Sequence, residues 1–106
     1  MASNAMNVNL SGKTALVTGA SSGIGAAVAR AMAANGAKVW VNHPDEATAD
    51  AAEVVVNSIA EAGGAAQAIQ ADVSSEPDVL AMFSALGSDP LDILVNNGGG
   101  AHSSPI

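Results

Sequence analysis

The 106-residue chain contains no cysteine and no tyrosine, and Trp40 and Phe83 are its only aromatic residues. Without cysteine the chain has neither disulfides nor thiolate metal sites, which fits a cytoplasmic location. Its two histidines have no carboxylate cluster at ligand spacing, so we expect no metal site. With 49% apolar residues, the core must come mainly from alanine, valine, isoleucine and leucine.

Basic residues are also scarce. Three lysines and arginines stand against ten acidic residues, which gives a formal net charge of −7. An excess of negative charge disfavours binding to nucleic acids and to anionic membranes. No apolar run approaches the roughly 20 residues of a membrane-spanning helix. We therefore predict no nucleic-acid partner and no membrane partner.

Short apolar runs alternate with helical patterns along the whole chain. Strands are expected at 14–18, 38–42, 65–73 and 91–95, with helices starting near 23 and covering 45–62 and 75–86. Short loops and right-handed crossovers then predict an α/β fold. It is a doubly wound parallel sheet with its first four strands in the order 3-2-1-4, three-layered and incomplete. Residues 1–5 are interpreted as the remnant of an expression tag.

Two of the helices carry local signals. Ser75 and Asp78 have the spacing of a capping box, with Pro77 in the first turn of the helix that they open. In the 45–62 helix, Val55, Ile59 and Ala62 are expected to share one face.

Between the first strand and the first helix lies the sequence TGASSGIG, residues 18–25. Gly19 allows a sharp turn off the strand. Gly23 would let the start of the helix approach a diphosphate, and Gly25 would let the helix pack closely on the strand. The free amides and the dipole of that helix would face the anion. Read alone, the same spacing is also that of a plain strand-to-helix turn.

Three motifs in order resemble the short-chain dehydrogenase/reductase family. TGASSGIG is similar to the family's cofactor motif, and Asp72-Val73 is similar to its pair beside the adenine ring. Asn96-Asn97-Gly98-Gly99 resembles its NNAG motif, with glycine at 98 where alanine is usual. The sequence around these motifs looks most like the glucose 1-dehydrogenase and 3-oxoacyl-carrier-protein reductase branches of the family. The resemblance covers residues 6–106.

The resemblance implies that residues 6–106 are the N-terminal part of a single NAD(P)-binding Rossmann domain. The parent would transfer a hydride between nicotinamide and a small alcohol or ketone, and we expect a homo-oligomer. The implied cofactor-binding residues are Gly19, Ser21, Ser22, Gly23, Ile24, Gly25, His43, Asp72, Val73, Asn97, Gly98 and Gly99.

Chemistry alone leaves some of these roles open. Asp72 is as well suited to forming a turn as to binding an exocyclic amine, and His43 is more often a solvated loop histidine than a ligand. The two asparagines could contact a ribose or tie two strand ends together.

The sequence does not decide between NAD and NADP. His43 falls where NAD-preferring members of the family carry aspartate, and Ser22 stands where NADP-preferring members often carry a basic residue. Asp45 and Glu46 are expected to begin the next helix instead. Since the acid that would repel a 2′-phosphate is missing, the hypothesis is dual use or a lean to NADP.

The family's catalytic serine, tyrosine and lysine have no counterpart here. The chain has no tyrosine, and its two lysines, Lys13 and Lys38, come too early. We therefore expect a cofactor-binding half that is inactive alone and continues into a longer protein, with a bare fourth strand that promotes self-association. The alternative is a non-catalytic nucleotide-binding or structural module.

Overall fold

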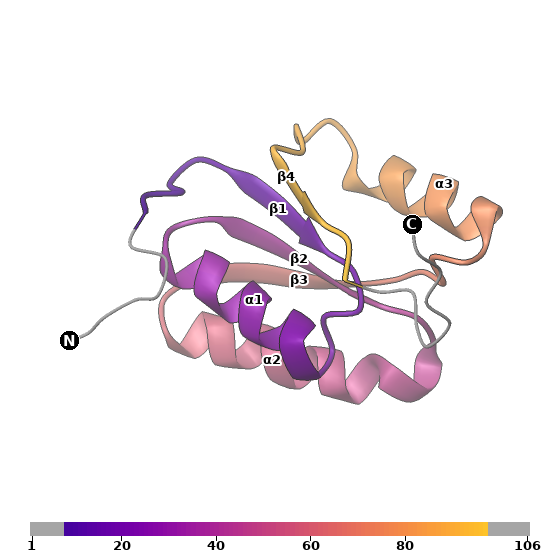
Figure 1. The fold of residues 1–106 in the computed structure, drawn as a ribbon, viewed down its shortest axis with the longest axis horizontal. Coiled ribbons are helices and arrows are strands. Elements are labelled where there is room, and N and C mark those ends of the chain that lie inside the picture. Colours follow the sequence, from indigo (N-terminus) through magenta and orange to yellow (C-terminus); the bar gives the residue numbers. More distant parts are fainter. Residues whose placement is uncertain (1–7, 98–106) are drawn as a thin grey trace.

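In a computed structural model, which describes residues 8–97, four parallel strands form one sheet between two helical layers (Figure 1). The strand order is β3-β2-β1-β4, which confirms the expected topology. The elements are β1 (Thr14–Val17), α1 (Gly23–Ala34), β2 (Lys38–His43), the 3-10 turn η1 (Glu46–Thr48), α2 (Ala49–Glu61), β3 (Ala65–Gln70), α3 (Glu76–Leu86) and β4 (Ile93–Val95).

Several element boundaries differ from the sequence prediction. β3 ends at Gln70 and not at residue 73. The chain has left the strand by Asp72, whose backbone N–H donates to Oδ2 of Asp78 and not to a neighbouring strand. The helix expected over 45–62 is split, since Asp45 caps η1 and α2 begins only at Ala49. β4 begins at Ile93, two residues later than expected.

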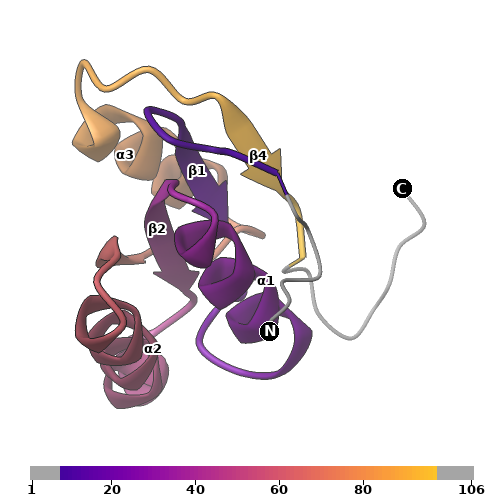
Figure 2. The same cartoon turned by 90° about the vertical axis from the view of Figure 1, so that its left-hand side faces the viewer.

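The alternation of side chains along the strands builds two cores. Ala15, Val17, Val39 and Val41 are buried on the face that α1 and α2 cover. Leu16, paired with Trp40 in register, lies in the second core with Met82 and Leu86 of α3. Figure 2 shows α1 and α2 on one side of the sheet and α3 on the other. The three-layer prediction is therefore confirmed, with unequal layers.

The α3 side of the molecule leaves apolar surface uncovered. Leu94 of β4 is 54% exposed, and Leu80 and Phe83 of α3 are also exposed. Within residues 8–97, β4 pairs with β1 alone, so its other edge carries unpaired backbone groups. The bare fourth strand expected from the sequence is present in the described fold.

The helix ends confirm part of the local signals. The Ser75 hydroxyl accepts a hydrogen bond from the N–H of Asp78 (3.3 Å), as a capping residue should. The reciprocal half of the box is missing because Asp78 accepts from Asp72 instead. Asp45 and Thr48 form a complete capping box that the sequence analysis did not predict. Val55 and Ile59 of α2 are buried, whereas Ala62, the C-cap residue of the same helix, is exposed.

Candidate functional site

The candidate residues lie where the parallel strands end. Loop 18–22 leaves β1 and enters α1, while His43 closes β2, and Asp72 and Val73 follow β3 (Figure 1). Asn96 and Asn97 follow β4. Since all four strands run in the same direction, these segments share one edge of the sheet. Gly98 and Gly99 lie outside the described residues.

Two glycines of the loop have a positive φ, and the turn expected at Gly19 is one of these two positions. Gly19 has φ +61° and Gly23 has φ +59°, both in the left-handed region that favours glycine. A Cβ on Gly25 would lie 2.3 Å from the Gly19 carbonyl oxygen and 2.6 Å from Nδ2 of Asn97. Any side chain at this position would push the start of α1 away from the loop and from the end of β4.

No side chain caps the N-terminus of α1, and no acidic side chain lies in its first turn. Its N-cap residue, Ser22, is extended (φ −159°, ψ 170°), and the Ser22 hydroxyl makes no capping hydrogen bond. The first turn contains no acidic residue, and Ile24 is 76% exposed beside it. The positive end of the helix dipole is therefore not neutralised locally, which favours an anion at this place.

Asn97 connects the fourth strand to the glycine loop. Its Nδ2 donates to the Gly19 carbonyl oxygen at 3.0 Å, across 78 residues of sequence. Thr18 adds to the same junction through its backbone N–H, which donates to the Val95 carbonyl at 3.0 Å. Of the two roles considered for this asparagine, the structure shows the tie between strand ends.

Asn42 is a residue of this site that the sequence analysis missed. Its side chain is only 2% exposed, at the end of β2. Oδ1 of Asn42 accepts from the N–H of Gly19 (3.1 Å), and Nδ2 donates to the carbonyls of Ala71 (3.1 Å) and Ile69 (3.3 Å). The Asn42 carbonyl also accepts from the N–H of Ala20 (2.8 Å). One buried amide thus joins the glycine loop to the end of β3. The only sign of Asn42 in the sequence was a polar residue near the end of an apolar strand.

His43 is buried and not solvated, contrary to the simpler sequence interpretation. Its side chain is 4% exposed, and Nδ1 lies 2.9 Å from the Asp45 carbonyl oxygen and 3.2 Å from Oγ1 of Thr48. Since a carbonyl can only accept, Nδ1 carries the proton in the contact with Asp45. The imidazole therefore orders the turn after β2.

Asp72 forms a turn, as one of its two interpretations required. Its Oδ1 accepts from the N–H of Ser74 (2.9 Å) and from the Ser74 hydroxyl (2.6 Å). Both hydrogen bonds lower the pKa of the Asp72 carboxyl, because they stabilise its charged form, and the bond from the Ser74 hydroxyl has the larger effect. Among the described residues Oδ2 has no hydrogen-bond partner, so it remains available to a ligand amine, with Val73 half-buried next to it.

Two kinds of site are absent from the part of the chain that the structure describes. No helix in residues 8–97 is long and apolar enough to cross a membrane. Over the same stretch, histidine, aspartate and glutamate side chains do not gather in any group of three or more that could hold a metal ion.

The fold and the loop define an open α/β domain with a glycine-rich turn at the carboxyl edge of its parallel sheet. The family model of the short chain dehydrogenases matches residues 13–106, and the chain belongs to this family.

Individual relatives agree with this assignment. The 7alpha-hydroxysteroid dehydrogenase of Escherichia coli K12 is 42% identical over 105 residues, covering 97% of this chain and 40% of the relative. The 3-oxoacyl-[acyl-carrier-protein] reductase of Synechocystis is 47% identical over 92 residues, covering 85% and 36%. The crystal structure of the angucycline C-6 ketoreductase LanV with bound NADP has a TM-score of 0.81 at 41% identity, covering 92% and 43%. The chain thus spans about two fifths of the length of the relatives it matches.

Replacing Asn42 tests its role at the strand ends. Asn42→Ala leaves the N–H of Gly19 and two strand carbonyls without their partner, which we expect to lower the free energy of unfolding by about 3 kcal/mol. Chemical denaturation measures this loss. Asn57→Ala, at an exposed position of α2, is the matched control and should change stability by less than about 0.5 kcal/mol. Equal effects of the two substitutions would contradict the role given to Asn42.

Replacing Ser74 tests the cause of the lowered pKa of Asp72. Ser74→Ala removes the hydroxyl donor, so the pKa of Asp72 should rise part of the way to the ordinary aspartate value. A lowered folded-state pKa means that the carboxylate stabilises the fold above the unfolded-state pKa. That contribution is lost as the pH falls through the lowered pKa, and it should be smaller in the variant. NMR titration of the Asp72 carboxyl carbon measures the shift, and Ser84→Ala should leave it unchanged.

Proposed function

We propose that this chain is the cofactor-binding half of an NAD(P)-dependent short-chain oxidoreductase. The parent enzyme would move a hydride between nicotinamide C4 and the carbon of a small alcohol or ketone. The observation that carries this proposal is the start of α1. Gly19 and Gly23 adopt positive φ there, and Gly25 packs against the loop, so that an uncapped helix end faces the carboxyl edge of the sheet.

Each part of the cofactor would meet a different strand end. The diphosphate would bind the loop and the first turn of α1, through Gly19, Ser21, Ser22, Gly23, Ile24 and Gly25. Oδ2 of Asp72 would accept from the adenine amine, with Val73 against the ring. The inner ribose would lie near Asn97, whose amide already fixes the Gly19 carbonyl, and near Gly98 and Gly99.

The end of β2 supports a lean to NADP. NAD-binding sites of this kind use a carboxylate there to bind the ribose 2′-OH. In this chain the position holds the buried imidazole of His43, and the nearby carboxylate of Asp45 is engaged with the N–H of Thr48 at 3.0 Å. No carboxylate of β2 itself would repel a 2′-phosphate. The LanV relative, whose structure contains NADP, fits the same lean.

Catalysis should need residues that this sequence lacks. The family resemblance assigns the proton transfer to a tyrosine assisted by a lysine, and the chain has no tyrosine. We therefore propose that the 106-residue chain binds the cofactor without turning over a substrate. The same behaviour would fit the alternative of a non-catalytic nucleotide-binding module, and a longer reading frame that contains the tyrosine and lysine would favour the enzyme.

Isothermal titration of the purified chain tests the cofactor proposal. NADPH should bind saturably and more tightly than NADH, and no NADPH should be consumed when a ketone is added. Gly25→Ala should weaken NADPH binding by at least about tenfold, since its Cβ displaces the start of the helix.

Gly12→Ala is the control for this substitution. Gly12 has a positive φ (+81°) but nothing within 4 Å of an added Cβ, so its replacement costs backbone strain of about 1 kcal/mol and should leave binding intact. If neither dinucleotide binds a chain that melts cooperatively, the proposed function of this chain fails. A clear preference for NADH would remove only the lean to NADP.

We further propose that the chain resides in the cytoplasm and associates with a second copy of itself through β4. The unpaired edge of β4 and the exposed side chain of Leu94 support this partner, because an open apolar strand is a template for pairing.

Sedimentation measures this association. The wild-type chain should form a concentration-dependent dimer or larger species, and Leu94→Glu should shift it toward the monomer. Val54→Glu, at a similarly exposed position of α2 (62%), should leave the association unchanged. A monodisperse wild-type monomer at high concentration would refute self-association.

A further inference from the structure

A groove lies between α1 and α2, away from the glycine loop. It has a volume of about 280 Å³. Its lining comes from the C-terminal halves of α1 and α2, from Ala62, and from Gly64, which directly precedes β3. These segments mark the amino edge of the sheet, opposite the edge where loop 18–22 lies. Its lining residues include Arg30, Ala34, Ser58, Ile59, Ala62 and Gly64.

The walls of this groove are mainly apolar, and the residues that form them pack closely against one another. Ile59 is only 3% exposed, whereas the methyl groups of Ala34 and Ala62 are exposed. Gly64 lies so close to Ile59 that an added Cβ would be 2.9 Å from its Cγ2. The groove is therefore formed by the packing of α1, α2 and the start of β3, and all of its lining lies within the described residues.

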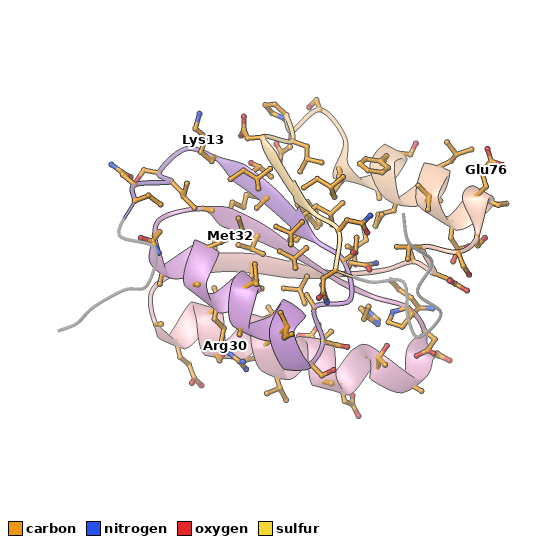
Figure 3. The ribbon with its side chains drawn as sticks, viewed as in Figure 1. Lys13, Arg30, Met32 and Glu76 are labelled. Atoms are coloured by element: carbon orange, nitrogen blue, oxygen red, sulfur yellow. The ribbon has the colours of Figure 1, made fainter. Side chains whose placement is uncertain are left out.

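One positive charge stands in the lining of this groove. Nε of Arg30 donates to the Ser58 hydroxyl oxygen at 2.9 Å, and that hydroxyl donates in turn to the Val55 carbonyl at 2.9 Å. Figure 3 shows the Arg30 side chain on the α2 side of α1. In residues 8–97 the ion pair that forms joins Lys38 to Asp89, and Arg30 has no carboxylate partner. In a chain of net charge −7, this guanidinium is held in place with its charge unmatched.

We propose that the groove binds an aliphatic monocarboxylic acid of medium chain length. The carboxylate would accept from the terminal nitrogens of Arg30, because a guanidinium presents paired donors that match the two oxygens of a planar carboxylate. The alkyl tail would lie along Ala34, Ala62 and Ile59, where it would be removed from water. This site is separate from the cofactor site and does not depend on the proposed function.

Titration of the 106-residue chain with octanoate, followed by amide NMR, tests this site. We expect saturable shifts at Ala34, Ser58 and Gly64, with the glycine loop unaffected. Arg30→Met keeps the apolar stem and removes the charge, so octanoate should bind at least about tenfold more weakly. Octan-1-ol, which keeps the tail and lacks the anion, should bind the wild-type chain more weakly by a similar factor.

Two alanine variants test whether the tail occupies the groove. Ala62→Leu should fill the space and abolish the shifts, whereas Ala60→Leu, exposed on α2 outside the lining, should preserve them. Melting curves verify that both leucine variants are folded. If Ala62→Leu does not fold, Arg30→Met still tests the site, because Arg30 is exposed and its replacement should not disturb the fold. Equal affinity for octanoate and octan-1-ol, no effect of Arg30→Met, equal effects of the two leucine variants, or shifts that do not saturate would each overturn the proposal.

Discussion

The arrangement of the carboxyl edge of the sheet depends on one buried amide. Asn42 accepts from the N–H of Gly19 and donates to the carbonyls of Ile69 and Ala71, so it fixes the glycine loop and the end of β3 on either side of β2. Because the side chain is 2% exposed, water cannot replace these bonds, and each partner would be left unsatisfied without it. The diphosphate loop and the adenine end of the proposed site are thus positioned by the same side chain.

A second constraint adds the fourth strand to this arrangement. Gly25 allows the start of α1 to lie against the Gly19 carbonyl, and Asn97 donates to that same oxygen from beyond β4. The first helical turn, the loop and the end of β4 therefore form one packed unit, in which a single added methyl group would clash at two points. This close packing leaves the uncapped end of α1 at the carboxyl edge of the sheet. We propose that the cofactor binds there.

The two faces of the sheet have different consequences. α1 and α2 bury the larger core, and the groove between them carries the unmatched charge of Arg30. α3 covers less of its own face and leaves Leu94 exposed beside an unpaired strand edge. The relatives that the chain matches are more than twice as long as the chain itself.

The sequence alone determined the features that depend on neighbours in the chain. The turn at Gly19 and the Ser75 cap follow from glycine and capping chemistry, which act over a few residues. The strand order follows from the alternation of strands and helices along the chain and from the right-handed crossovers between them. The tertiary structure decided the rest. Asn42 and Asn97 find partners 23 to 78 residues away, Asp78 binds Asp72 and leaves the expected capping box incomplete, and His43 is buried where a solvated residue was expected. The physical reason is that a polar side chain bonds whichever donor or acceptor the folded chain brings within about 3 Å of it, and only packing determines which one that is.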